Sequence, residues 1–396
     1  MGEVEQKVKS PKPELSVWMI SDGRPGHFNQ TLGVVRALEK GYDVKLIKIE
    51  TRLRLGFLRP LLKLVCNSRR GWLKRLLAPL IRFSYYPFVL PSVDATVACC
   101  AHPDVIISCG GQTLYLNVFL ARQTKARNFF LGSLRGVHPR LFTAIISGLS
   151  MPGVPNLVEL ELSPGLFDAE KAAEAGQAFL ATLESAPVFT PGESASGSQK
   201  TYWAMLVGGD GAGYQFENAD MAALESLMLM ASRRYGVRWL LTTSRRTSRE
   251  HEQRLQCFAQ KHPEVFAYTL FYHQKPEALV MAFLGAADKV FATEDSSSMI
   301  SEAMMSRRPV MTLSPRHSNP NENYRRFLDK HRHKHRIASL HLSGWENLNM
   351  DVAFQQFTPL QMDIDSQLLE LLQPFLVSKN RHITCREGSI PPRATD

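Results

Sequence analysis

The stretch VFATEDSSSMISEA, residues 290–303, has the pattern of a buried strand, a short polar turn and a helix. Residues 290–292 are apolar and suit a strand, and Asp295 and the following serines are favourable N-cap residues. The first turn of such a helix presents backbone N–H groups at the positive end of the helix dipole, which favours phosphate. Glu302, about a turn and a half further along, is placed to accept from a ribose diol. An ordinary capped helix with a solvated Glu302 explains this stretch alone equally well.

The same alternation of strand, turn and helix recurs along the chain. A strand at residues 15–20, a helix from about 29 to 39 and a strand at 44–49 form a βαβ start, which predicts a parallel sheet. The pattern restarts with a strand at 202–207 and a glycine-rich turn at 208–214. Two such halves predict an α/β fold with two Rossmann-like domains facing a cleft, and a ligand at the carboxyl ends of the strands.

Chain length and composition agree with two globular domains. The 396 residues exceed a usual single core, and the contents of 44% hydrophobic and 21% charged residues are typical of globular proteins. Residues 184–200 are rich in Ser, Pro and Gly, as in a linker. We therefore expect an N-terminal domain over 1–190 and a C-terminal domain over 191–396.

The cysteines and the N-terminus indicate the compartment. None of the six cysteines forms a CxxC pair, which argues for a reducing compartment without a disulfide framework or a zinc site. Residues 1–13 are polar, so no signal peptide is expected, and no uncharged apolar run has the length of about 18 residues that a transmembrane helix needs. We expect a cytoplasmic protein.

Residues 51–90 carry nine basic residues and no acidic ones, so 10 − 9 leaves a net charge of only +1 for the rest of the chain. Leucines and aromatic residues interleave with these cations at helical spacing. A basic amphipathic helical insertion of this kind favours docking at an anionic membrane, here the inner membrane. A core-packed insertion with a basic outer face and a nucleic-acid patch are the alternatives; few flat aromatic residues argue against nucleic acid.

Four polar turns should meet at one edge of the C-terminal sheet, because each follows a strand: 208–214, 244–248, 271–275 and 294–298. Together they offer backbone N–H groups, guanidiniums and hydroxyls suited to a diphosphate. We expect no acidic pair in the chain to have the compact Asp-x-Asp form that holds a metal-bound sugar nucleotide, and therefore expect a metal-independent transfer without a cofactor. The predicted donor-binding residues are Gly208, Gly209, Ser244, Arg245, Arg246, Ser296, Ser297, Ser298 and Glu302.

The N-terminal half offers the acceptor side. A sugar transfer needs a base for the acceptor hydroxyl, and either His27 or Asp22 can serve in a cleft. A helix-start histidine satisfied by the backbone is the simpler alternative for His27. The other predicted acceptor-side residues are Arg24, Gly110, Gly111 and Gln112.

Residues 331–336, HRHKHR, have the composition of a possible metal site. We reject a metal because the histidines alternate with cations and no carboxylate joins them. A solvated segment, or one facing an anionic surface, is expected instead.

Three motifs carry a family resemblance: SDGRPGHFNQT at 21–31, SRRT at 244–247 and EDSSSMISEA at 294–303. In this order they resemble the mitochondrial-fission ELM family, which contains bacterial predicted glycosyltransferases and a plant mitochondrial-fission factor. The layout also resembles GT-B glycosyltransferases such as the lipid-linked GlcNAc transferase of peptidoglycan synthesis. The basic stretch at 51–90 and the Gly-Arg-Pro-Gly-His turn depart from the pattern of that transferase.

The resemblance implies that residues 296–298 contact the donor phosphates and that Glu302 contacts the ribose. It also implies that His27 is the base. It implies a glycosyltransferase moving a sugar from a nucleotide sugar to a lipid-linked glycan such as lipopolysaccharide. A non-catalytic membrane-associated adaptor and a nucleotide-sugar epimerase or hydrolase are the alternatives.

Overall fold

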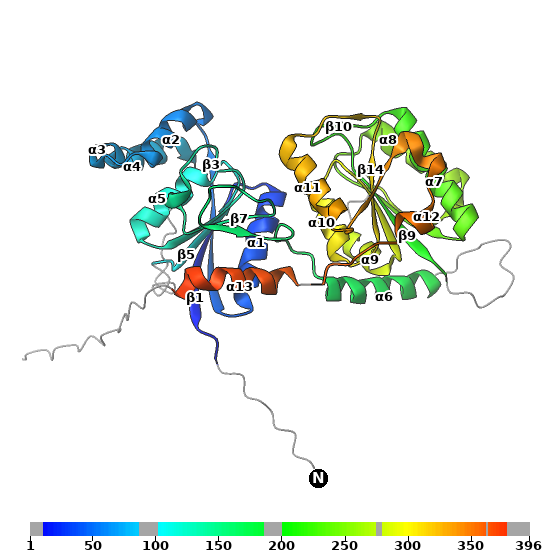
Figure 1. Cartoon of the computed structure of the whole chain (residues 1–396), viewed down its shortest axis with the longest axis horizontal. Coiled ribbons are helices and arrows are strands. Elements are labelled where there is room, and N and C mark those ends of the chain that lie inside the picture. Colours follow the sequence, from blue (N-terminus) through cyan, green and yellow to red (C-terminus); the bar gives the residue numbers. More distant parts are fainter. Residues whose placement is uncertain (1–10, 87–101, 186–199, 275–278, 362, 378–396) are drawn as a thin grey trace, which may run out of the picture.

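The computed structural model describes residues 11–86, 102–185, 200–274, 279–361 and 363–377. Two domains lie side by side, each built on a six-stranded parallel sheet covered by helices (Figure 1). The predicted α/β fold with two Rossmann-like domains is therefore confirmed.

The N-terminal sheet has the strand order β2-β1-β5-β6-β7-β8. The chain passes from β1 to β2 on one side and then to β5 on the other, so the topological switch point lies beside β1. Helix α1 (Pro25–Glu39) begins four residues after β1 ends, and α5 (Leu114–Thr124) follows β5. The strands are β1 (Glu14–Ser21), β2 (Asp43–Glu50), β5 (Val105–Cys109), β6 (Arg127–Leu131), β7 (Ala144–Ser147) and β8 (Leu157–Glu159).

The C-terminal sheet has the order β12-β11-β9-β13-β14-β16, with its switch point beside β9. All six residues of β9 are buried, as expected for a strand covered on both faces. Trp203 stacks on Phe291 with ring centroids 5.5 Å apart, at the centre of this core. The strands are β9 (Tyr202–Val207), β11 (Arg238–Thr243), β12 (Phe266–Leu270), β13 (Lys289–Thr293), β14 (Val310–Ser314) and β16 (Ala338–His341). The main helices are α7 (Asn218–Tyr235), α8 (Arg249–Lys261), α9 (Val280–Ala286), α10 (Ser297–Met305) and α11 (Glu322–His333).

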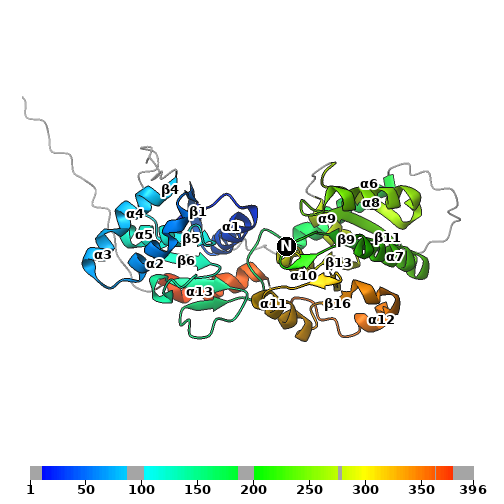
Figure 2. The ribbon, with the colours of Figure 1, turned by 90° about the horizontal axis from the view of Figure 1, so that it is seen from above.

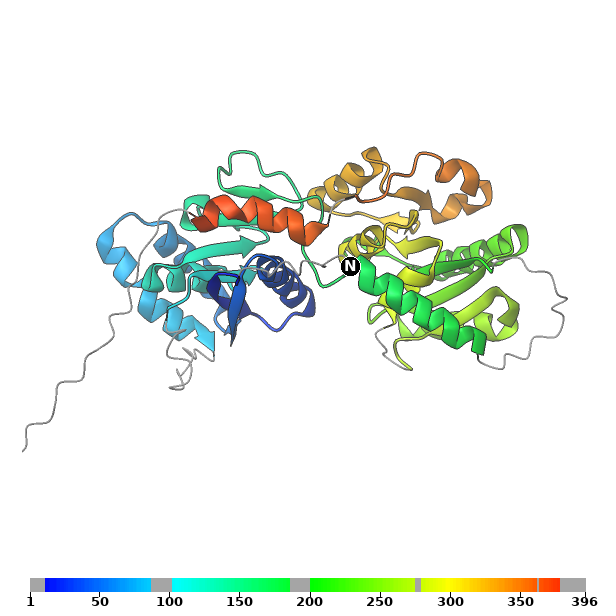
Figure 3. The same cartoon turned by 90° about the horizontal axis from the view of Figure 1, so that it is seen from below.

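Two helices place the division between the domains elsewhere than the sequence suggested. Helix α6 (Ala169–Ser185) packs against α9 of the C-terminal domain, with Phe179 5.3 Å from Phe283. Helix α13 (Ile364–Val377) returns to the N-terminal domain, where Leu368 is buried in its core (Figure 3). The chain therefore first crosses between the domains after β8, before the Ser/Pro/Gly-rich stretch, most of which lies outside the described residues. The Ser/Pro/Gly-rich composition therefore did not mark the division between the domains.

The basic segment forms short helices between the paired strands β3 (Arg52–Leu53) and β4 (Tyr85–Tyr86). These are η1 (Gly56–Leu58), α2 (Arg59–Asn67), α3 (Gly71–Arg75) and α4 (Leu77–Ser84). Helices α2–α4 lie at the end of the molecule away from the C-terminal domain (Figures 1 and 2). Their inner side chains, Leu62, Val65 and Ile81 among them, are buried, whereas six large apolar side chains are exposed: Phe57, Leu61, Leu64, Trp72, Leu76 and Phe83. Residues 87–90 of the predicted insertion lie outside the described residues. A bilayer-crossing helix is not found within the described parts of the chain.

Candidate functional site

A cleft of about 770 Å³ lies between the two domains, at the carboxyl ends of the strands. The N-terminal domain lines it with the start of α1, the ends of β6 and β7, and the crossing segment at 163–167. The C-terminal domain lines it with the turn at 244–246, the first turn of α10 and the start of α11. Seven of the predicted donor-binding residues line this cleft: Ser244, Arg245, Arg246, Ser296, Ser297, Ser298 and Glu302.

The first turn of α10 is open to the cleft. Ser296 is the N-cap residue, but its side chain accepts no hydrogen bond from the helix backbone. Its Oγ atom instead lies 3.1 Å from Oγ of Ser298. The helix therefore presents its positive end and two hydroxyls to a ligand, an arrangement that suits a phosphate.

The adjacent arginines have different roles. Arg246 Nη1 donates to the backbone oxygen of Asp295 at 2.6 Å and lies 3.2 Å from its carboxylate, so it joins two turns of the site. Arg245 is exposed in the cleft, and none of the described residues pairs with its guanidinium. Arg245 is thus the guanidinium that is free to bind an anion.

Buried groups behind the cleft hold these turns in place. Burial raises the pKa of Asp295, while Thr293, Gly209 and Arg246 oppose the shift. Gly208 and Gly209 do not line the cleft, although the sequence placed them among the donor-binding residues. A Cβ atom at Gly208 would lie 2.0 Å from Oδ1 of Asp295, and one at Gly209 2.0 Å from the carbonyl oxygen of Arg246. These glycines allow the turns to approach each other.

Glu294 fixes the start of α10 and the neighbouring α11. Its carboxylate accepts from the hydroxyl of Tyr214 at 3.0 Å, from Thr312 Oγ1 at 2.7 Å and from Arg332 Nη2 at 2.8 Å. Tyr324 of α11 donates to the Glu294 carbonyl at 2.5 Å and lines the cleft. The sequence analysis missed α11 and its cleft residues; the asparagine-rich start of this helix, with Asn321 as N-cap, was the available signal.

Glu302 lines the cleft wall one and a half turns into α10. Burial raises the pKa of this carboxyl to about 7. Among the described residues no partner for the carboxyl is found. A hydrogen-bond donor from a ligand, such as a ribose hydroxyl, would satisfy it.

His27 and Asp22 form one dyad at the start of α1. His27 Nδ1 lies 2.9 Å from Oδ2 of Asp22, whose side chain is fully buried. When Nδ1–H donates to this carboxylate, Nε2 is left as a proton acceptor. Asp22 is therefore placed to orient His27. His27 and Asp22, the two alternative candidates for the base, can thus act together, with His27 as the base and Asp22 as its partner.

The dyad lies beside the main cleft, which the adjacent Pro25 and Gly26 line. Gly110 has a φ of +86°, and a Cβ atom there would lie 2.3 Å from Cε1 of His27. Gly111 is covered by Arg135, and the Gln112 carbonyl accepts from the Tyr85 hydroxyl at 2.7 Å. Arg24 is exposed and 3.9 Å from Asp22. Of the predicted acceptor-side residues and the dyad, none lines the cleft itself, whereas the neighbouring Gly26 and Gly132 do.

The run at 331–336 was expected to be solvated or to face an anionic surface. This holds for the exposed His333, Lys334 and His335 but not for the rest of the run. His331 is fully buried, burial lowers its pKa to about 4, and neither ring nitrogen has a partner in the described structure. Lys334 and Arg336 pair at 3.1 and 3.4 Å with Glu161, which lies in the segment that follows β8. The run therefore contacts an acidic residue, Glu161, that is about 170 residues away in the sequence, and it lies where the two domains meet.

An Asp-x-Asp motif outside the four turns, Asp363-Ile364-Asp365, was overlooked in the sequence analysis. Both carboxylates pair with cations, Asp363 with Lys40 and Asp365 with Arg36, and neither lines the cleft. Within the described ranges no group of three or more His, Cys, Asp and Glu side chains is arranged to hold a metal ion. Metal independence remains a prediction.

The chain is similar to one protein family and to several solved structures. The family model described as mitochondrial fission ELM1 matches residues 25–357. A UDP-GlcNAc 2-epimerase from Methanocaldococcus jannaschii is 11% identical with a TM-score of 0.51, covering 91% of this chain and 99% of the epimerase. MurG from Acinetobacter baumannii is 13% identical, TM-score 0.43, covering 92% and 95%. ADP-heptose LPS heptosyltransferase II from E. coli is 12% identical, TM-score 0.43, covering 91% and 98%. No curated protein matches.

Proposed function

We infer that this chain, which belongs to the mitochondrial fission ELM1 family, is a glycosyltransferase that moves a sugar from a nucleotide-sugar donor to a lipid-linked glycan. The observation that carries the proposal is the cleft, where the unpaired Arg245 and the open first turn of α10 lie together. The His27–Asp22 dyad beside it supplies a base. This is the constellation that transfer from a diphosphate leaving group requires.

The C-terminal domain binds the donor. The diphosphate lies against the first turn of α10, with Arg245 pairing with its oxygens and the serine hydroxyls donating to them. Glu302 accepts from the ribose hydroxyls. The helix dipole and the guanidinium neutralise the charge that develops on the leaving diphosphate, so the proposed transfer needs no metal ion.

The N-terminal domain activates the acceptor. His27 Nε2 takes the proton of the acceptor hydroxyl as its oxygen bonds to the anomeric carbon of the sugar. The bond from that carbon to the diphosphate breaks, and the electron pair leaves with the diphosphate. Asp22 orients the imidazole and stabilises the imidazolium that forms.

The acceptor is held by a membrane, and the insertion at 51–86 supports this. Its six exposed apolar side chains lie among cations that include the exposed Arg69 and Arg70. Such a surface fits the interface of an anionic bilayer, here the cytoplasmic face of the inner membrane. Lipopolysaccharide precursors are the acceptor class that this location suggests.

Binding of uridine, cytidine, guanosine and thymidine nucleotide sugars by calorimetry tests the donor site. We expect one nucleotide class to bind. Arg245→Ala should weaken the affinity at least about tenfold, as loss of a charge-assisted contact does. The control is Arg249→Ala, which removes a nearby exposed arginine on α8 and should leave the affinity unchanged. His27→Asn should keep donor binding and abolish transfer. Absence of binding by every nucleotide sugar would overturn the proposal.

A nucleotide-sugar epimerase or hydrolase is a second candidate, favoured by the similarity of the fold to the archaeal epimerase. Such an enzyme converts the soluble donor without an acceptor. Incubation of the protein with the bound nucleotide sugar alone distinguishes the two. An adaptor without catalysis would instead retain its cellular function in Arg245→Ala and Glu302→Ala variants, and lose it when the exposed apolar residues of the insertion are made polar.

A further inference from the structure

Two segments of the described chain cross between the domains, and both pass the C-terminal half of α1. The first is residues 160–168, between β8 and α6; the second is residues 359–361 and 363–365, which lead into α13. Ile364 is still buried in the core of the C-terminal domain, whereas Leu368, one turn later, is buried in the core of the N-terminal domain. The start of α13 is therefore the point at which the second segment crosses.

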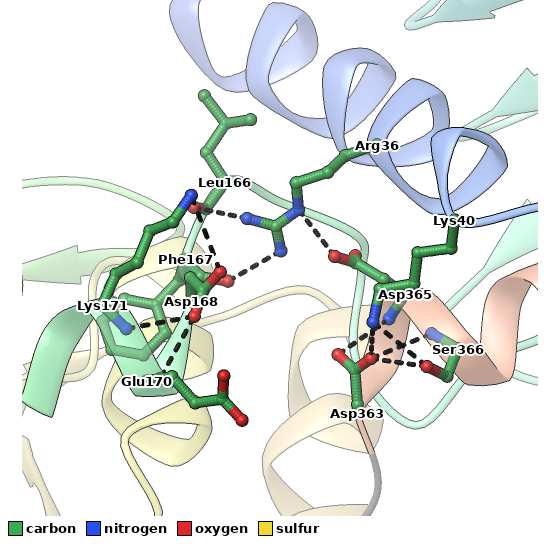
Figure 4. Close-up of polar contacts among 10 residues, drawn as sticks. All are labelled: Arg36, Lys40, Leu166, Phe167, Asp168, Glu170, Lys171, Asp363, Asp365 and Ser366. Carbon is green, nitrogen blue, oxygen red and sulfur yellow. Dashed lines mark hydrogen bonds and ion pairs between the residues drawn. The ribbon is translucent and has the colours of Figure 1, made fainter. Parts of the chain in front are cut away.

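One side chain contacts both crossing segments. Arg36 of α1 donates from Nη1 to the carbonyl of Leu166 and from Nη2 to that of Phe167, each at 2.9 Å. Its Nε lies 2.6 Å from Oδ2 of Asp365 (Figure 4). A planar guanidinium can make all three contacts at once, which a lysine ammonium cannot do with the same geometry.

The surroundings of Arg36 hold the same segments. Lys40, one turn further along α1, pairs with Asp363 and donates to Ser366 Oγ at 3.1 Å (Figure 4). The backbone of the first segment also lies directly on α1, because a Cβ atom at Gly33 would lie 2.5 Å from the backbone nitrogen of Gly165. The last turns of α1 thus form the surface on which both connections rest.

The opposite end of α1 carries the catalytic dyad. His27 lies in the first turn of the helix and Arg36 in the last, on one rigid element of 15 residues. Leu166 and Phe167, whose carbonyls Arg36 holds, also line the ligand cleft. A change in the angle between the domains must therefore alter contacts made by α1, the helix that positions the base.

We propose that Arg36 is a positioning residue that fixes both crossing segments to α1 and so couples the arrangement of the two domains to the position of His27. The consequence for catalysis rests on the proposed function. The role in joining the domains does not, because it concerns the protein without ligand.

The test uses the full chain with Arg36→Lys, which keeps the charge, and Asp365→Asn, which keeps the size. The matched control is Arg122→Lys, because Arg122 Nη2 donates to the Cys66 carbonyl at 2.9 Å within the N-terminal domain. For Arg36→Lys and for Asp365→Asn we expect a broader distribution of interatomic distances in small-angle scattering. We also expect amide hydrogen exchange to be about fivefold faster at 160–168 and 359–366, with the exchange rates of β9 and β11 unchanged. The double variant should add little to Arg36→Lys, because that variant already lacks the contact between the guanidinium and Asp365.

The catalytic readout separates the two claims. In the Arg36→Lys variant we expect kcat to fall about tenfold through misplacement of the base, while the affinity for the nucleotide stays within about twofold of the wild type, because Arg245 and α10 are untouched. Scattering and exchange that match the wild type, or that change equally in Arg122→Lys, would overturn the role of Arg36. If scattering and exchange change as expected but no transfer is detected even in the wild type, the proposed function fails and the joining role stands.

Discussion

Two cation-rich regions of the molecule have opposite surroundings. The basic insertion, residues 51–86, has no acidic residue of its own, and six large apolar side chains are exposed on it. The junction run, residues 330–336, pairs with Glu159 of β8 and with Glu161 of the segment that follows it, and contains a buried histidine. Charge density alone therefore does not show which partner a basic segment has. The acidic residues that meet it in the folded chain decide this.

The largest effect should come from reversing charge on the insertion. Each cation near an anionic surface contributes about 1 kcal/mol, so Arg69→Glu with Arg70→Glu, a change of four charges, should cost about 4 kcal/mol, or roughly a thousandfold in vesicle affinity. Flotation with phosphatidylglycerol vesicles measures this. The control is Arg233→Glu with Arg234→Glu, an equally exposed pair on α7.

An equal loss of vesicle binding in the α7 variant would show that net charge, and not the insertion, drives association. Binding of the wild type that is insensitive to salt or to lipid charge would contradict membrane docking altogether, because exposed charges are screened at high ionic strength.

A pH-dependent effect should come from His331 in the junction run. Burial lowers its pKa to about 4, and Lys330, Lys334 and Arg336 act in the same direction while Glu161 opposes them. The unfolded chain therefore takes up the proton at higher pH, and stability present above pH 6.5 is lost as pH falls towards 4. Between pH 7 and 5 this amounts to about 2 kcal/mol.

His331→Leu should remove this dependence, because the variant has no titrating group at that position. Thermal midpoints at pH 7 and pH 5 for both proteins measure the difference. A stability gap between wild type and variant that is the same at the two pH values would contradict the burial of a neutral imidazole in the junction.

A smaller effect is expected from Glu161, whose side chain is 16% exposed and pairs with Lys334 and Arg336. Although burial raises the pKa of this carboxyl, the two cations lower it overall, so its stabilisation is present above pH 4.5 and lost as pH falls. Glu161→Gln should lower the stability of the protein by about 1–2 kcal/mol at pH 7. Urea denaturation measures it, with Glu159→Gln as control because that carboxylate is 42% exposed. A loss in Glu159→Gln as large as in Glu161→Gln would contradict the prediction.

Strands β9 and β13 could be predicted because each is a short apolar run bounded by turn residues. The edge strand β16, with the sequence ASLH, is not such a run and was not predicted. The donor turns followed, since parallel strands place their carboxyl ends at one edge. What could not be predicted depends on contacts between distant residues. Arg245 and Arg246 are equivalent in the sequence, and only the position of Asp295 separates them. The same holds for Asp363 and Asp365, whose partners lie on α1.

The smallest effect is expected at Asp329, which shares the guanidinium of Arg332 with Glu294. The pair between Arg332 Nη1 and Asp329 is 3.1 Å long, but the Asp329 side chain is 57% exposed, whereas that of Glu294 is 3% exposed. Asp329→Asn should cost less than about 0.5 kcal/mol in urea denaturation, because water solvates the exposed carboxylate and Arg332 keeps its contact with Glu294. A loss above about 1 kcal/mol would mean that exposed pairs also stabilise the junction. The contrast between the two basic regions would then rest on the number of acidic neighbours and not on their burial.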